Sequence, residues 1–189
     1  MNVPSRPLFI QALDTAVGIL RLRKGPEDMP AAPALLWLML LGGVLLRAAA
    51  HAMPAPESTG NPAVLMALEL GITLGGVMFA LRAAGYPERF TQTATSILAC
   101  QLVMAPALLA ARWLLLTNYE TPGAMAGLSQ LLYVIVAVWL LVAMVRILRS
   151  ATGWPLFGCV VLALGIEMIT VIAALALYPP APDTAASPL

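Results

Sequence analysis

Residues 127–148 read GLSQLLYVIVAVWLLVAMVRIL, and this continuous apolar run decides the fold class. A bilayer core of about 30 Å is crossed by about 20 residues of α-helix, so the run is long enough to span a membrane. Its apolar residues do not alternate with polar ones, which favours a helix over a strand of a membrane barrel. We predict four more spans of this kind, at residues 33–53, 62–84, 91–116 and 155–178.

The composition agrees with an all-α, polytopic membrane protein with five transmembrane helices. Hydrophobic residues make up 61% of the chain and charged residues 10%, whereas soluble domains carry roughly 25% charged residues. A net charge of +1 gives no long-range field that would attract nucleic acid. Cys100 and Cys159 lie inside apolar runs, so we expect small hydrophobic side chains rather than a disulfide or a reactive pair.

Residues 1–32 precede the spans, and their first part has helical periodicity. Polar and small residues recur at Gln11, Asp14, Thr15, Gly18 and Arg21. Apolar residues fill the remaining surface, at Leu8, Phe9, Leu13, Ala16, Val17 and Leu20. We expect an amphipathic helix that lies on the membrane surface, packs on the protein's own helices, or does both. The Pro-rich residues 24–33 then form an elbow that turns the chain into the membrane.

Basic residues divide unequally between the two sides of the membrane. Eight of the ten fall on one side: Arg6, Arg21, Arg23, Lys24, Arg82, Arg89, Arg146 and Arg149. By the positive-inside rule, the N-terminus is cytoplasmic and the C-terminus exoplasmic in a bacterial inner membrane. We divide the chain into residues 1–32, a five-helix domain at 33–178, and a disordered exoplasmic tail at 179–189.

Two glutamates lie inside predicted spans, where a charged side chain is costly. Glu69 is in the outer half of the second span, and Glu167 is near the middle of the fifth. Such a residue costs about 2.5–3.5 kcal/mol at the helix centre, so each should face protein or water. At the depth of Glu69, the possible partners are Arg47 and Arg112. Glu167 is deeper, where it stays protonated or bonds Gln101.

These five side chains define the first candidate site. The main interpretation is a buried polar clasp that holds the helices together, formed by Glu69, Glu167, Gln101, Arg47 and Arg112. The alternatives are a site for a small solute or lipid headgroup and a proton relay. A lone imidazole at His51, with no second His or Cys in reach, does not indicate a metal site.

Two further features concern contacts with other helices or proteins. Gly71 and Gly75 have the spacing that lets helices approach closely, either within the chain or in a dimer. A candidate partner face on the cytoplasmic side comprises Arg82, Tyr86, Glu88, Arg89, Arg146 and Arg149.

The loop after the second span reads GYPERFTQT at residues 85–93 and is followed by an apolar helix that contains Pro106. This motif resembles the Yip-domain family of Ypt/Rab-interacting membrane proteins, in particular its bacterial branch. Trp139 in the fourth span, and its exit at Arg146, Arg149, Gly153 and Trp154, are similar to the same family. The resemblance implies a five-helix scaffold without catalytic residues, and Rab binding is not carried over because the long cytosolic region is absent.

We therefore expect a non-enzymatic scaffold or binding component of the membrane, with no cofactor. Its expected partners are membrane lipid and another membrane protein or a second copy of itself. The first alternative is a transporter or channel component for protons or a small solute that uses Glu69 and Glu167. The second is a membrane enzyme acting on lipid, although the loops offer no nucleophile with a matching base.

Overall fold

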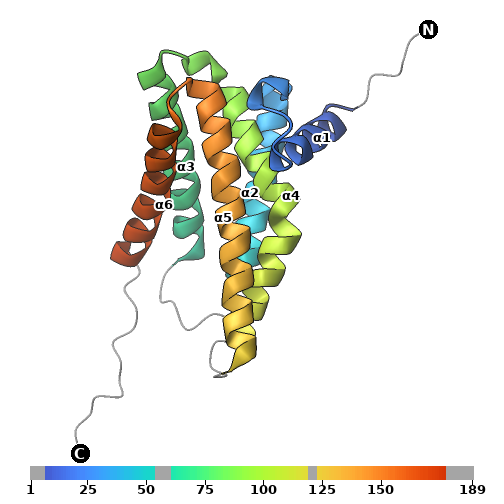
Figure 1. Ribbon diagram of the computed structural model, residues 1–189, viewed down its shortest axis with the longest axis vertical. Helices are drawn as coiled ribbons and strands as arrows, with labels where there is room; N and C mark the ends of the chain where they lie inside the picture. The colour runs from blue at the N-terminus through green and yellow to red at the C-terminus, as the bar shows by residue number, and fades with distance from the viewer. Residues whose placement is uncertain (1–6, 54–60, 119–122, 178–189) are drawn as a thin grey trace, which may run out of the picture.

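A computed structural model describes residues 7–53, 61–118 and 123–177, which form a bundle of helices (Figure 1). The short first helix is α1 (Leu8–Leu20), and a 3-10 turn, η1 (Pro26–Asp28), follows it. The long helices are α2 (Pro33–His51), α3 (Pro62–Ala84), α4 (Phe90–Thr117), α5 (Ala124–Thr152) and α6 (Leu156–Leu177). A second 3-10 turn, η2 (Pro87–Arg89), joins α3 to α4. The predicted tail at 179–189 lies outside the described residues.

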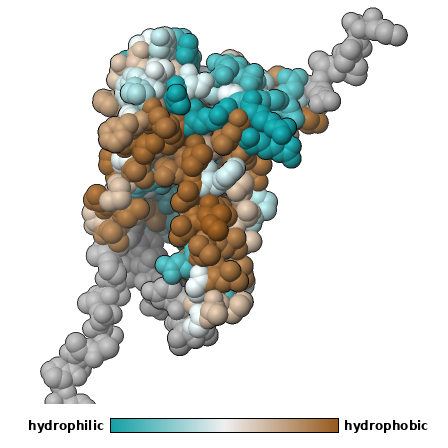
Figure 2. Space-filling view, viewed as in Figure 1, coloured by the Kyte–Doolittle hydropathy of each residue, from teal (hydrophilic) through white to brown (hydrophobic). Residues whose placement is uncertain are grey.

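Helices α2 to α6 are each long and apolar enough to cross a membrane, so the protein is an integral membrane protein, as the sequence predicts. Large apolar side chains point outward along the bundle, among them Trp37 at 71% exposed and Phe157 at 79%. Contact of this much apolar surface with water would be unfavourable, whereas contact with the hydrocarbon of a bilayer is not. Figure 2 shows hydrophobic residues over most of one side of the bundle and hydrophilic residues gathered near α1.

The predicted spans are confirmed, with shifts at their ends. The second span matches α3 at both ends, whereas α5 starts at Ala124 and continues to Thr152. The helix continues beyond Leu148 because the next four residues, Arg149, Ser150, Ala151 and Thr152, are compatible with a helical backbone. It ends where Gly153 adopts a left-handed φ of 71°. Arg146 and Arg149 therefore lie on the last turns of α5 rather than in a loop.

Helix α4 lies at the centre of the bundle and packs against α1, α2, α3 and α5. Its first half buries three hydroxyl side chains, Thr93, Thr95 and Ser96. Each donates a hydrogen bond of 2.6–2.9 Å to the carbonyl four residues earlier, which for Thr93 is that of Arg89 in the adjoining η2 turn. The hydroxyls are thus satisfied without a partner from another helix.

Helix α1 packs against α4 and α5, as one of the two compatible sequence interpretations expected. Its buried side chains include Ala12, Ala16 and Ile19. Thr15, which the sequence places on the polar face, is also buried, and its hydroxyl lies 3.5 Å from the carbonyl oxygen of Asp28. The polar side of α1 is thus partly covered, because the η1 turn lies against Thr15. Whether α1 also contacts lipid stays a prediction.

Close contact of α3 with another helix occurs at a different glycine from the predicted pair. A Cβ atom on Gly71 or Gly75 would meet nothing within 4 Å, so the prediction of packing within the chain is wrong for this pair. Gly76 makes the contact instead, since a Cβ there would lie 2.6 Å from Cδ1 of Ile166 in α6. The rotation of α3 about its axis decides which glycine faces a neighbour.

The segments at one end of the bundle carry most of its arginines, and we call this the basic end. It includes the segment from Arg21 to Asp28, the η2 turn and the junction between α5 and α6 (Figure 1). Gln92 of α4 holds the elbow there by donating a 3.0 Å bond to the carbonyl of Met29. Ser150 of α5 donates a 2.7 Å bond to Glu27 of η1. The elbow is therefore fixed to the ends of α4 and α5.

Candidate functional site

A cavity of about 560 Å³ with charged and apolar lining residues lies among the five long helices, and we call it the central cavity. Its lining includes all five side chains of the first predicted site, Arg47, Glu69, Gln101, Arg112 and Glu167. They come from α2, α3, α4 and α6. Apolar residues of α5, such as Met144 and Ile147, line it as well. Residues far apart in the sequence are thus brought around one space.

Arg47 and Glu69 form an ion pair across α2 and α3. Nε of Arg47 lies 3.1 Å from Oε2 of Glu69, and the two side chains are 13% and 28% exposed. Nη1 of Arg47 also donates a 3.3 Å bond to the carbonyl of Gly43, one turn earlier in α2. Because water reaches the pair only in part, each charge depends on the other for its solvation.

Gln101 of α4 extends this ion pair into a three-helix network. Both terminal nitrogens of Arg47 lie 3.5 Å from Oε1 of Gln101. The amide therefore faces Arg47, and the predicted bond to Glu167 is not formed. Thr73, one turn beyond Glu69, donates a 2.8 Å bond to the carbonyl of Glu69. The orientation of Gln101 is consistent with its carbonyl oxygen accepting from a cation.

Arg112 of α4 lines the cavity without joining the ion pair. Its Nε atom is buried and has no hydrogen-bond partner among the residues that the structure describes. The sequence left Arg47 and Arg112 open as partners of Glu69, and the structure places Arg47 there. An unpaired buried guanidinium nitrogen costs free energy unless water or a ligand accepts from it.

Glu167 of α6 lies at the edge of the cavity and is exposed. The sequence requires Glu167 to face protein or water, and the structure places it at this cavity. Within the described part of the chain, Glu167 receives no hydrogen bond. Its carboxyl group is therefore available to water or a ligand in the cavity.

Four other polar residues line the central cavity, His51, Thr73, Tyr133 and Thr170. His51 lies with Nε2 at 3.9 Å from Oε1 of Glu69. Tyr133 of α5 also lines it, and the sequence interpretation missed this residue. A phenol in an otherwise apolar run was the available signal, because buried tyrosine hydroxyls need a polar partner. In the described residues no group of three or more His, Cys, Asp and Glu side chains is placed to hold a metal ion.

Three residues of the predicted partner face lie at one turn. Tyr86, Glu88 and Arg89 are exposed at the η2 turn. The guanidinium of Arg89 lies 4.3 Å above the ring of Tyr86 and donates a 3.1 Å bond to the carbonyl of Ala151. Arg89 therefore ties η2 to the end of α5. Arg82 is exposed on the last turn of α3.

Arg146 and Arg149 belong to a different part of the basic end. They line a cavity together with Arg23 and Lys24 from the segment that follows α1. The candidate partner face is thus divided between the η2 turn and this second cavity.

Comparisons of this chain with known protein families, with curated proteins and with solved structures find no match. The resemblance to the Yip-domain family therefore rests on its sequence motifs and stays a prediction.

Proposed function

We propose that this integral membrane protein is a non-enzymatic scaffold or binding component that holds another membrane component in its central cavity. The observation that carries the proposal is that some polar groups in that cavity bind one another, whereas others are left to bind a ligand. Arg47, Glu69 and Gln101 satisfy one another. Arg112 keeps a buried nitrogen without a partner in the described chain, and Glu167 is exposed at the edge. One cation and one carboxyl group thus remain to bind a molecule with a polar head.

The chemistry of the lining supports binding rather than catalysis. Cys100 is the thiol among the described lining residues, and its Sγ points at the carbonyl oxygen of Ala16, 3.8 Å away. A nucleophile needs a neighbouring base that accepts its proton. The lining instead combines charged groups with many apolar side chains, as sites for amphipathic ligands do.

Affinity purification in a mild detergent, followed by mass spectrometry of co-purifying proteins and lipids, tests this function. We expect the wild-type protein to retain one membrane component in a fixed ratio. Arg112→Gln should reduce that retention about tenfold, because a charged hydrogen bond to a ligand contributes about 1.5–3 kcal/mol. Arg82→Gln, at an exposed position outside the cavity, is the matched control. Equal retention by both variants would contradict the proposal.

A second candidate is a transporter of protons or of a small solute. It is favoured by one observation, that both intramembrane glutamates line the same cavity. Flux of protons or solute measured in liposomes separates the two functions. Flux that is lost in a stably folded Glu167→Gln variant would establish transport and overturn the scaffold.

For the orientation, we propose that the basic end is cytoplasmic in a bacterial inner membrane. Cytoplasmic loops carry an excess of Lys and Arg, and Arg21, Arg23, Arg82 and Arg89 gather at that end. A reporter that is active only outside the cytoplasm should be active when fused after Asn118 and inactive when fused after Tyr86. The reverse pattern would invert the topology.

A further inference from the structure

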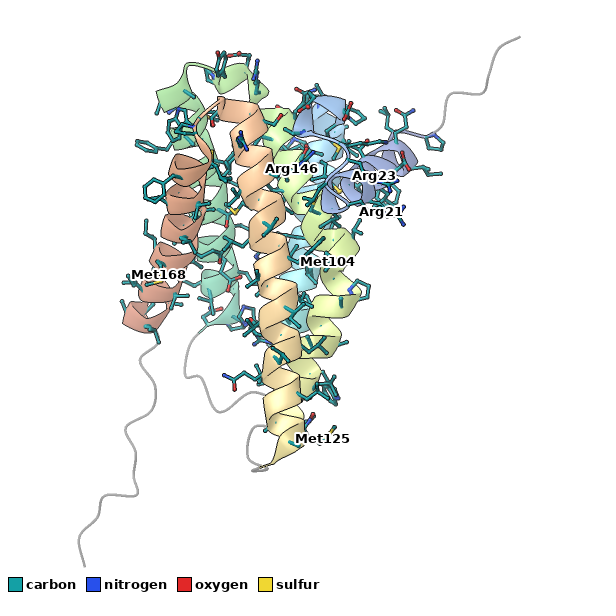
Figure 3. All side chains as sticks on the ribbon, viewed as in Figure 1. Arg21, Arg23, Met104, Met125, Arg146 and Met168 are labelled. Atoms are coloured by element: carbon teal, nitrogen blue, oxygen red, sulfur yellow. The ribbon has the colours of Figure 1, made fainter. Side chains whose placement is uncertain are left out.

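A cavity of about 740 Å³ opens at the basic end, between α5, α6 and the segment after α1, and we call it the basic groove. Four cationic side chains line it, Arg23, Lys24, Arg146 and Arg149. Figure 3 shows Arg23 near the end of α1 and Arg146 on the upper part of α5, at the same end of the bundle. The groove thus collects cations from two segments that are distant in the sequence.

Of the four cations in the groove, one forms an ion pair within the described chain. Lys24 pairs with Asp14 at 2.7 Å. The described residues provide no ion pair for Arg23, Arg146 or Arg149. Three guanidinium groups around one cavity repel one another, and an anion between them would remove that repulsion.

The two carboxylates in the groove do not neutralise the arginines. Glu27 accepts a 2.7 Å bond from the hydroxyl of Ser150. Asp28 accepts a 3.1 Å bond from the backbone N–H of Gly25 and so closes the η1 turn. Four cationic and two anionic side chains line the groove, and Asp14 pairs with Lys24 from outside it, so the net charge of these seven groups is +1. Its chemistry therefore favours a group with negative charge.

The wall of the groove beside the arginines is apolar. Val142 and Val145 of α5 and Leu156 and Val160 of α6 line it. Leu156 begins α6 next to the end of α5, whereas Val142 lies one turn before Arg146 on α5, so the apolar wall extends from the basic end toward the middle of the bundle. A free phosphate ion would contact only the arginines. A phospholipid would also cover the apolar wall.

Leu22 gives an independent indication that the groove is built for an apolar chain. Its φ angle is +59°, the one positive φ of a non-glycine residue in the described chain. It closes α1 through the bonds Leu22 N–H to Ile19 and Arg23 N–H to Gly18. The same pair of bonds closes α3, but there the left-handed residue is Gly85. A leucine is strained where glycine is the common residue.

The strained residue lies at the groove itself. The Leu22 side chain lines the cavity and is 38% exposed. Strained backbone positions concentrate at binding sites, because the surrounding structure keeps them for the side chain that they present. Glycine at position 22 would fit the backbone better and would remove apolar surface from the groove.

We propose that the basic groove binds an anionic phospholipid of the leaflet that surrounds the basic end. The phosphate lies among Arg23, Arg146 and Arg149, and an acyl chain follows the wall formed by α5 and α6. Leu22 covers the glycerol region. This site is separate from the ligand of the central cavity and does not depend on it.

Native mass spectrometry of the purified full chain tests the proposal, with micelles that contain equal amounts of phosphatidylglycerol and phosphatidylcholine. We expect wild-type protein to retain phosphatidylglycerol preferentially. Arg146→Gln and Arg149→Gln should each weaken this retention about fivefold, as expected for one cation at a membrane surface. Arg82→Gln, at the same end but outside the groove, should leave it unchanged.

Two further variants separate lipid binding from other effects. Leu22→Gly should weaken retention about threefold through lost apolar contact, with a melting temperature at or above that of the wild type. Arg112→Gln in the central cavity should leave retention of phosphatidylglycerol unchanged, so failure of the proposed function and failure of this site are distinguishable.

Three results would overturn the proposal. The first is equal retention of phosphatidylglycerol and phosphatidylcholine by the wild type. The second is an equal loss in Arg82→Gln and Arg146→Gln. The third is displacement of the lipid by inorganic phosphate, which would show that the arginines bind a free anion.

Discussion

Replacing Arg47 with glutamine is expected to lower the free energy of unfolding by about 2 kcal/mol, because it leaves the Glu69 carboxylate partly buried without its cation. The side chains are 13% and 28% exposed, so the cost should be below that of a fully buried pair. Melting temperatures of the purified variants in a mild detergent provide the measurement. Glu69→Gln should cost less, since an amide keeps a hydrogen-bond acceptor for Arg47.

A double-mutant cycle isolates the pair. Arg47→Gln combined with Glu69→Gln should cost about 0.5–2 kcal/mol less than the sum of the single variants, because no unpaired charge remains. Arg112→Gln is the matched control, since Arg112 lies in the same cavity without contacting Glu69. It should be additive with Glu69→Gln, and Glu167→Gln alone should be nearly silent. If the losses in unfolding free energy of Arg47→Gln and Glu69→Gln are additive, the ion pair does not stabilise the fold.

Replacing Gly76 with leucine is expected to lower the free energy of unfolding by about 1–3 kcal/mol through overpacking between α3 and α6. Its first side-chain atom would lie 2.6 Å from Cδ1 of Ile166. The isoleucine tip can shift for one methyl group, but a leucine needs α6 to move away. Helix α6 has the smallest buried share of the five spans, 11%, so few contacts resist that movement. Thermal unfolding in detergent measures the loss.

Gly75→Leu is the control for this steric prediction. Gly75 is the neighbouring residue on α3, and a Cβ there would meet nothing within 4 Å. The variant should keep the wild-type melting temperature, and an equal loss at both positions would show that the contact with Ile166 is not the cause. The same variant tests the dimer predicted from Gly71 and Gly75, because leucine would then shift the oligomeric state.

The positions of the five spans could be predicted because about 20 consecutive apolar residues give a strong signal that needs no tertiary context. Their ends could not be placed to the residue. Helix α5 continues through Thr152 until Gly153 stops it, although the apolar run ends at Leu148. Helix ends depend on single capping residues, whereas spans depend on the sum of many.

The charged residues that line the central cavity could be predicted from the sequence, but which of them form an ion pair could not. Intramembrane charges at helical spacing must face protein or water, which selected Arg47, Glu69, Arg112 and Glu167. The choice of Arg47 as the partner depends on the side of α3 that α2 occupies. The place of Glu167 at the cavity depends on how α6 packs against the other helices. Both depend on how the helices are arranged relative to one another, and the periodicity of one helix does not reveal that arrangement.

The bonds inside α4 bear on the order in which the chain is made. During synthesis α4 enters the bilayer before α5 exists, so the faces that α5 later covers first meet lipid. Hydrocarbon offers no partner to a hydroxyl group, yet Thr95 and Ser96 donate to carbonyls of their own helix, and Thr93 donates to Arg89 of the adjoining η2 turn. These three hydroxyls of α4 therefore have their hydrogen-bond partners from the moment of insertion, before α5 packs against them.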